Sequence, residues 1–293
     1  MKNLILFFIL AALLSCNPAA NRKQTTAKEG KANYRLELVW ESDTLLRTPE
    51  SVLFDRKRDI LYVSNVNMNP WEKDGNGFIS KMDREGNIIE LKWIEGLHGP
   101  KGMGISGNSL FIADIDDLVE ADLETGQIIN KIELSGQPQL NDITVSSNGT
   151  VYVSGSGSNT IYQLKDGVLK GIFTGEEGER FNGLYWEKGR MLFITSASSL
   201  FRELIHETGE VNIIAENMGR GDAIAPVGDG GYIATSWSGI VFHVAADGEV
   251  TSLLNTEAEG ENAADADFCI ENQILYLPTF FKNQVKAYKL VSF

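Results

Sequence analysis

The feature that most constrains this chain is a six-fold repeat with a spacing near 40 residues. In each unit a short polar anchor stands directly ahead of an apolar segment. The anchors are Pro49-Glu50, Lys101-Gly102, Asn141-Asp142, Asn182-Gly183, Asp222-Ala223 and Ala264-Asp265. Successive anchors, counted through Glu50, Lys101, Asn141, Asn182, Asp222 and Asp265, are separated by 51, 40, 41, 40 and 43 residues. A period of this size with strands in every unit is typical of a β-propeller.

The units share one order of strands and turns. After the anchor and its strand comes a tight turn, such as Ser147-Asn148-Gly149, and then a second apolar strand. Asn-Gly turns favour two-stranded hairpins. The sixth unit has only three strands before the chain ends, and we expect residues 34–40 to supply its outer strand. The sequence therefore predicts an all-β, six-bladed propeller over residues 34–293, with its last blade closed by the N-terminal strand.

The first residues have the pattern of an export signal. A positively charged start precedes the apolar run 4–14, which is too short for a stable membrane span. Leu13-Leu14-Ser15-Cys16 resembles the lipobox of bacterial lipoproteins, in which the cysteine is acylated and becomes the first mature residue. A secretory signal cut at another small residue is the alternative. We predict a signal peptide over 1–15, lipid on Cys16 and a flexible tether over 16–33.

The lipoprotein resemblance implies a place in the bacterial cell envelope, facing the periplasm, with the N-terminal lipid as the contact with the membrane. The formal net charge of −14 argues against nucleic acid and anionic lipid surfaces as partners. Three histidines and two cysteines, spread along the chain, fit a zinc site poorly. We expect a monomer that takes a small-molecule substrate.

Equivalent positions in a propeller converge on its axis, so the anchors should face one end of a central channel. Glu50, Asn141, Asn182 and Asp222 offer two carboxylates and two amide oxygens. This set suits calcium, or another divalent metal. The alternative is that each anchor is ordinary turn chemistry ahead of a strand. Asp265, at the sixth anchor, is either a further ligand or an acceptor behind the ligands.

Three residues near the anchors are candidates for substrate binding. Lys101 replaces an oxygen ligand with a cation, which either binds a substrate carboxylate or pairs with Glu50 or Asp265. His98 precedes it and either transfers protons or is an ordinary loop histidine. Trp71 lies in the long segment 65–77, which is either a lid over the channel or a disordered decoration.

At these positions the chain resembles the six-bladed calcium propellers of the gluconolactonase and regucalcin (senescence marker protein) type, with paraoxonase and diisopropyl fluorophosphatase as relatives. In that family, oxygen ligands hold the metal in motifs that match Pro49-Glu50, Asn141-Asp142, Asn182-Gly183 and Asp222 here. The chain departs from the family where Ala223 replaces a glycine and where Gln139 replaces an arginine common in the lactonases. The resemblance therefore supports the metal more than any particular substrate.

The resemblance implies a calcium-dependent hydrolase of a lactone or related ester, with Asp222 or Asp142 as the catalytic base. The alternative is a non-catalytic, lipid-anchored propeller whose channel binds a sugar or a protein partner. The two departures from the family pattern favour this alternative.

Overall fold

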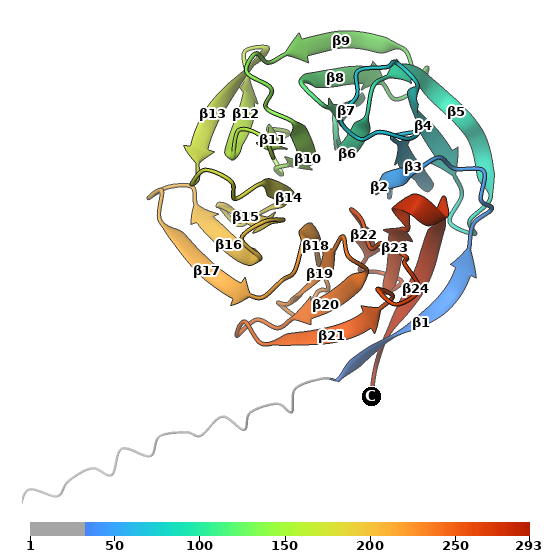
Figure 1. Ribbon diagram of the computed structural model, residues 1–293, viewed down its shortest axis with the longest axis vertical. Coiled ribbons are helices and arrows are strands. Elements are labelled where there is room, and N and C mark those ends of the chain that lie inside the picture. The colour runs from blue at the N-terminus through green and yellow to red at the C-terminus, as the bar shows by residue number, and fades with distance from the viewer. Residues whose placement is uncertain (1–32) are drawn as a thin grey trace, which may run out of the picture. The chain divides into compact units, whose positions relative to one another are not determined.

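The computed structural model describes residues 33–293, so the predictions for the signal peptide, Cys16 and the tether up to residue 32 lie outside the described residues. The described residues form six four-stranded antiparallel sheets arranged as blades around a central axis (Figure 1). The predicted all-β, six-bladed propeller is confirmed. Within residues 33–293, no helix has the length and apolar character needed to cross a membrane.

Five blades each consist of four consecutive strands that run from the axis to the rim. Blades 1 to 3 contain β2 (Pro49–Asp55), β3 (Ile60–Asn65), β4 (Gly77–Met82) and β5 (Ile88–Leu97); β6 (Pro100–Ser106), β7 (Ser109–Asp114), β8 (Asp117–Asp122) and β9 (Ile128–Glu133); and β10 (Leu140–Val145), β11 (Val151–Gly155), β12 (Thr160–Lys165) and β13 (Val168–Thr174). Blades 4 and 5 contain β14 (Phe181–Glu187), β15 (Arg190–Thr195), β16 (Leu200–Ile205) and β17 (Val211–Glu216); and β18 (Gly221–Pro226), β19 (Tyr232–Ser236), β20 (Ile240–Val244) and β21 (Val250–Asn255).

The sixth blade joins the two ends of the described chain. It contains β22 (Asp267–Cys269), β23 (Ile274–Pro278), β24 (Val285–Ser292) and β1 (Tyr34–Glu41), with the 3₁₀ helix η1 (Phe280–Lys282) after β23. Strand β1 pairs with β24, from Tyr34 opposite Ser292 to Glu41 opposite Lys286. The predicted closure by the N-terminal strand is therefore confirmed, and β24 has no free edge.

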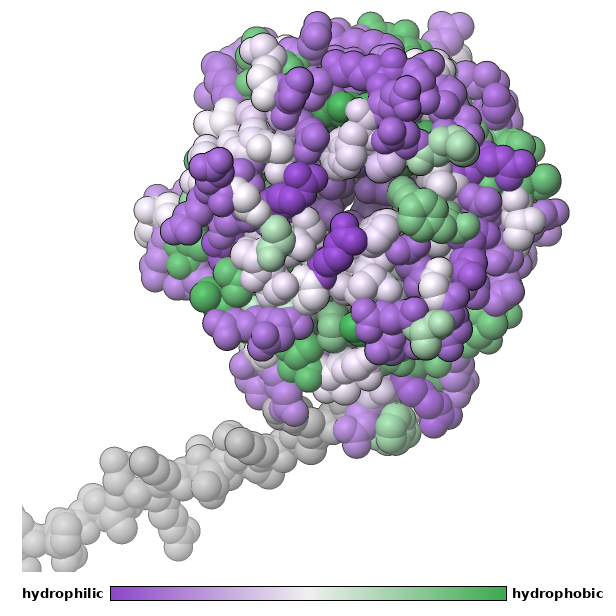
Figure 2. Space-filling view, viewed as in Figure 1, coloured by the Kyte–Doolittle hydropathy of each residue, from purple (hydrophilic) through white to green (hydrophobic). Residues whose placement is uncertain are grey.

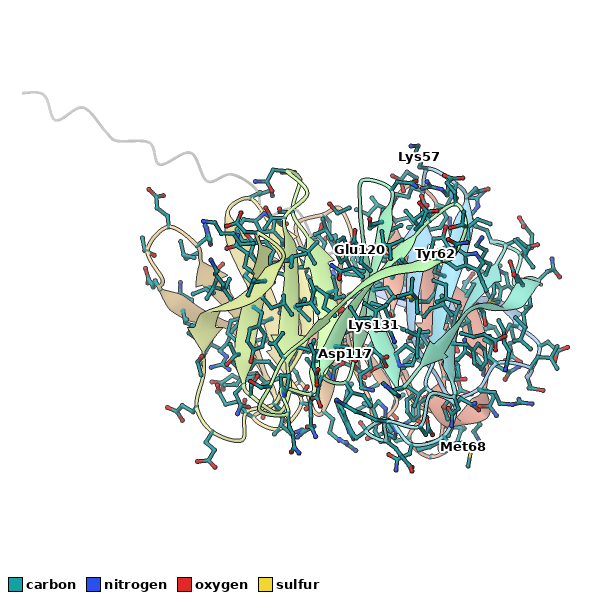
Figure 3. All side chains as sticks on the ribbon, turned by 90° about the horizontal axis from the view of Figure 1, so that it is seen from above. Lys57, Tyr62, Met68, Asp117, Glu120 and Lys131 are labelled. Atoms are coloured by element: carbon teal, nitrogen blue, oxygen red, sulfur yellow. The ribbon has the colours of Figure 1, made fainter. Side chains whose placement is uncertain are left out.

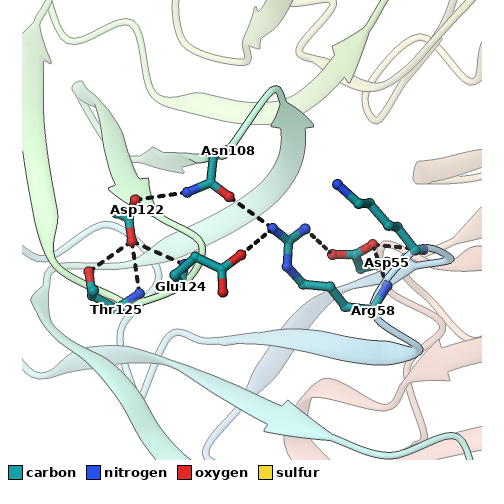
Figure 4. Close-up of polar contacts among 7 residues, drawn as sticks. Asp55, Arg58, Asn108, Asp122, Glu124 and Thr125 are labelled. Atoms are coloured by element: carbon teal, nitrogen blue, oxygen red, sulfur yellow. Dashed lines mark hydrogen bonds and ion pairs between the residues drawn. The ribbon is translucent and has the colours of Figure 1, made fainter.

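Apolar layers between neighbouring blades form the core. Strands such as β3 and β7 are apolar on both faces because each face meets a different blade, and Leu61 and Ile112 are fully buried. Polar bridges join the blades as well. Arg58 of blade 1 bonds Asp55 at 3.0 Å, and crosses to Glu124 of blade 2 at 2.8 Å and to Asn108 at 2.9 Å (Figure 4).

Each of the first five anchors lies in a β-bulge of the innermost strand. In β10, Leu140 is opposite Gly155 and Ile143 is opposite Val153, so one extra residue sits at Asn141-Asp142. The register shifts in the same way at the anchors of blades 1, 2, 4 and 5. A bulge takes a residue out of the ladder and re-aims its side chain. The bulges thus explain how polar anchors leave the sheets and reach the channel.

Hydroxyl side chains of the second strands stabilise these bulges. The backbone N–H of Asp142 donates to Ser154 Oγ at 2.9 Å. In blades 1 and 5, equivalent hydrogen bonds run from Ser51 to Ser64 and from Ala223 to Thr235. Because these hydroxyls are buried, each satisfies an N–H group that the shifted ladder leaves without a carbonyl.

Candidate metal and substrate site

The four predicted metal ligands line one cavity at the end of the channel where the innermost strands begin, which we call the mouth. The cavity has a volume of about 130 Å³ and contains Glu50, Asn141, Asn182 and Asp222 in its wall. Lys101 and Trp71 also line it. In the space-filling view the centre of this face is hollowed, and hydrophilic side chains reach its edge (Figure 2). The repeat therefore brings together residues from five blades.

Three of the four carry a buried oxygen without a hydrogen-bond partner. These atoms are Glu50 Oε2, Asn182 Oδ1 and Asp222 Oδ1. Asn141 donates its Nδ2 to Ser156 Oγ at 3.1 Å, which leaves Oδ1 as its remaining acceptor. Buried polar atoms without partners are costly, and oxygens of this kind are what calcium prefers. The donor set fits a hard divalent cation.

The electrostatics of the mouth agree with this fit. Burial raises the pKa of Glu50 well above its usual range; Lys101 opposes the rise, and the charges of Asp222 and Asp265 add to it. Burial and the charge of Asp265 likewise raise the pKa of Asp222, against a hydrogen bond from Asn182. A divalent cation would offset both costs. No cluster of three or more His, Cys, Asp or Glu in residues 33–293 is arranged to hold a metal, so this set depends on its amides.

The close approach of neighbouring innermost strands requires a glycine after one ligand. A Cβ atom on Gly183 would lie 1.9 Å from the carbonyl oxygen of Asp222. No side chain could occupy that space without moving the strands apart. The Asn-Gly pair at the fourth anchor therefore serves the packing of blade 4 against blade 5 as well as the site.

Lys101 fastens the long loop to the mouth. Its Nζ donates to the carbonyl oxygens of Pro70 at 2.8 Å and Gly99 at 3.0 Å, and lies 4.2 Å from the centre of the Trp71 ring. Burial lowers the pKa of Lys101, while the charge of Glu50 raises it. The lysine thus both lines the cavity and orders the loop that covers part of it.

Two further contacts hold the segment 65–77. Lys73 pairs with Asp116 of blade 2 at 2.9 Å, and the N–H of Gly75 donates to His98 Nδ1 at 3.1 Å. His98 contacts the loop through this hydrogen bond and is not among the described residues that line the mouth cavity. Met68 of the loop and Lys57 of the turn after β2 lie on opposite faces of the molecule (Figure 3). The loop therefore lies on the face where β2 begins, which is the face of the mouth, and Trp71 is in the wall of its cavity.

Asp142 lies elsewhere, in a second cavity of about 260 Å³ farther along the innermost strands. Its two oxygens accept N–H groups from Ile143 and from Leu184 of the next blade, both at 2.6 Å. Asp267 does the same between blades 6 and 1, with Phe268 and Phe54. The structure does not bring Asp142 and Asp222, the two candidate bases, into one cavity.

Asp265 also lines the second cavity, where it accepts the hydroxyl of Ser51 at 2.6 Å. Its backbone N–H donates to the carbonyl of Glu50, and its carbonyl accepts from Val52, so it joins blade 6 to blade 1. The sixth anchor therefore differs from the other five. It is a closing contact, and its side chain lies outside the cavity at the mouth.

Four further residues of this wall were not predicted as site residues. Arg180, Arg220, Trp237 and Phe280 are in the wall of the mouth cavity. Each arginine stands two positions ahead of an anchor residue, Asn182 or Asp222. That shared register was the available signal, because equivalent positions of the repeat face the same end of the channel.

The fold and the site together define a six-bladed β-propeller with a polar site on its axis. The sequence matches no protein-family model and no curated protein. Among solved structures, the chain is similar to a gluconolactonase from Xanthomonas campestris, with 15% identity over 89% of this chain and 91% of that one and a TM-score of 0.67. A streptogramin B lyase gives 14% identity over 88% and 98% of the two chains, with a TM-score of 0.66. At these identities the similarity shows a shared fold and nothing beyond it.

Proposed function

We propose that this protein is a divalent-metal-dependent hydrolase, with calcium as the metal, that opens a lactone or a related ester. The observation that carries the proposal is the set of three unpartnered buried oxygens, on Glu50, Asn182 and Asp222, in one cavity. Together with Asn141 they would hold the cation. The similarity to a gluconolactonase propeller supports the same class of reaction. Calcium held by these residues would act as a Lewis acid toward the substrate carbonyl.

The chain's own residues would position the substrate and move the proton. The carboxylate of Asp222 lines the cavity beside the place of the cation and can accept a proton from the attacking water. Trp71 and Trp237 form apolar walls that limit access of bulk water. Asp142 is the weaker of the two candidate bases, because both of its oxygens accept backbone N–H groups.

The test is calcium dependence in the full chain. Protein treated with a chelator is assayed against a panel of aldonolactones and aryl esters, before and after calcium is restored. We expect hydrolysis only with the metal. Glu50→Gln should abolish it together with the rise in melting temperature that calcium gives wild type. Glu85→Gln, the same change at an exposed residue in the turn after β4, is the matched control.

Two outcomes would count against the hydrolase. Full activity in the chelator would remove the metal from the reaction. Stabilisation by calcium or by a sugar, without turnover of any substrate, would support the lipid-anchored binding propeller instead.

We further propose that a lipid on Cys16 anchors the protein at the periplasmic face of the bacterial cell envelope. The support is the lipobox-like sequence at residues 13–16. Cys16→Ser should move the protein from the membrane fraction to the soluble fraction and stop incorporation of labelled palmitate. Unchanged fractionation of this variant would refute the anchor.

A further inference from the structure

We propose that the mouth selects ligands that carry an anionic group, a carboxylate or a phosphate, and that Arg180 and Arg220 bind it. This rests on the proposed function for the identity of the reacting group, which would be a lactone or ester. The anionic group would sit on the part of the substrate away from the reacting carbonyl. The inference thus narrows the substrate class from neutral lactones to acidic ones.

The first support is that neither arginine forms an ion pair with a carboxylate among the described residues, although the charge of Arg220 acts on Asp222 and opposes the rise that burial causes in its pKa. Six other arginines among the described residues form ion pairs with carboxylates: Arg35, Arg56, Arg58, Arg84, Arg190 and Arg202. Arg47, Arg180 and Arg220 form none within residues 33–293, and of these three only Arg180 and Arg220 line the mouth cavity. Arg180 donates to the neutral Gln139 Oε1 at 3.3 Å. In a chain with a net charge of −14, two unpaired guanidinium groups in one cavity wall need an explanation.

The second support is their register. Arg180 and Arg220 occupy the same position of the repeat, in blades 4 and 5, which are adjacent. Each stands two residues ahead of a candidate metal ligand, so both face the mouth. Two guanidinium groups presented from neighbouring blades offer planar pairs of N–H donors, which match the oxygens of a carboxylate or phosphate.

The third support is that a tryptophan ring lies near each guanidinium group, closely at Arg220 and at longer range at Arg180. The Cζ atom of Arg220 lies 4.4 Å from the centre of the Trp237 ring, and that of Arg180 lies 5.9 Å from the Trp71 ring. Stacking of this kind restricts the rotamers of a long side chain before a ligand arrives. Less conformational entropy is then lost on binding, which favours affinity.

Charge at the mouth also differs from charge elsewhere. The cavity wall holds the cations Lys101, Arg180 and Arg220 against the carboxylates Glu50 and Asp222, and a bound divalent cation would raise the positive excess. The rest of this acidic chain repels anions. The field therefore directs an anionic ligand to the mouth and away from other surfaces.

The test measures binding without turnover. Calorimetry on the full chain in excess chelator compares three probes with the same sugar ring: glucose, glucuronate and glucose 6-phosphate. We expect the two anions to bind at least roughly tenfold more tightly than glucose, and their difference identifies the preferred group. Arg180→Gln and Arg220→Gln should each reduce that preference by roughly threefold and leave glucose unaffected. Arg35→Gln, on the outer strand β1, removes the same charge far from the mouth and should change nothing.

Equal binding of all three probes, absence of anion binding, or an equal effect of Arg35→Gln would overturn the proposal. A second readout is the ratio of kcat/KM for glucarolactone to that for neutral gluconolactone, which should fall in the two mouth variants. The binding measurement needs neither metal nor catalysis. If the wild-type protein binds the anions but hydrolyses none of the substrates, the proposed function is rejected and this inference stands.

Discussion

At the scale of residues, Asp222 and Asp142 differ in their hydrogen-bond partners, although the sequence suggests either one as the catalytic base. Asp222 has a buried oxygen without a partner in the mouth cavity. Asp142 uses both oxygens to accept backbone N–H groups, one of them from the next blade. A carboxylate with unused acceptors can bind a cation or a proton, whereas one with both oxygens engaged holds strands together.

Asp142→Asn should therefore destabilise the fold without changing the calcium response. An amide has one oxygen, so its NH₂ group must face either the Ile143 or the Leu184 N–H, and one buried donor loses its acceptor. The expected cost is about 1–3 kcal/mol. Each kcal/mol lowers the melting temperature by roughly 2–4 °C in a domain of this size. Thermal unfolding with and without calcium is the measurement.

Asp267→Asn, the equivalent change between blades 6 and 1, should behave in the same way. If Asp142→Asn kept wild-type stability but lost hydrolysis, Asp142 would be the catalytic base after all.

The repeat predicts the positions of the ligand candidates. The rest of the cavity wall depends on contacts of individual loops, which the spacing of the repeat does not predict. Glu50 and Asp222 are found by their spacing. Trp71 reaches the cavity because Lys101 binds the carbonyl of Pro70, which depends on the conformation of one irregular loop. The loop that carries Trp237 follows from the order of strands, but the contact of its ring with Arg220 does not.

At the scale of elements, strand β1 both closes the ring and covers part of the apolar core. Its ladder with β24 closes the ring. Its side chains also cover two apolar clusters, since Tyr34 and Leu36 pack on one cluster and Trp40 on another. Among the described residues, β1 is therefore the strand of blade 6 that comes from the N-terminal side of the chain. The other three strands, β22 to β24, come from its C-terminal side.

Deleting residues 34–41 should abolish cooperative unfolding. The loss exposes the edge of β24 and uncovers apolar side chains in two clusters, so the remaining strands no longer form one cooperative unit. Calorimetry and binding of a dye that detects exposed apolar surface are the measurements. Deletion of residues 20–27, which removes the same number of residues ahead of β1, is the control. A wild-type transition in the β1 deletion would contradict the closure model.

At the scale of the whole molecule, the ring follows from sequence because every unit repeats the same local pattern and one strand from the other end completes it. The function depends instead on the differences among the units. Lys101 and Asp265 both belong to anchors of the repeat, yet one binds a loop at the mouth and the other joins blades 6 and 1. Those differences arise from single side chains, so the fold is more predictable than the site.

The closed ring should open at alkaline pH. Burial raises the pKa of Tyr34, Tyr62, Tyr276 and Tyr288 to about 12, with a hydrogen bond to Asp229 adding to the effect at Tyr34. Unfolded tyrosine ionises near pH 10, so the folded state holds these protons more tightly. Their contribution to stability is therefore complete below pH 10 and is lost as the pH rises through about 12. Three of the four lie in blade 6, the blade that closes the ring.

We expect tyrosinate absorbance and the loss of strand signal in circular dichroism to change together over this interval of pH. Tyr34→Phe, which removes the hydroxyl that bonds Asp229 at 2.7 Å, should remove the ionisable group of Tyr34 and with it that residue's share of the alkaline loss. The stability of the variant should then fall less steeply above pH 10 than that of wild type, from a lower value at neutral pH because the hydrogen bond is gone. Ionisation of these tyrosines near pH 10 with the strands intact would show that burial in the blades does not hold their protons.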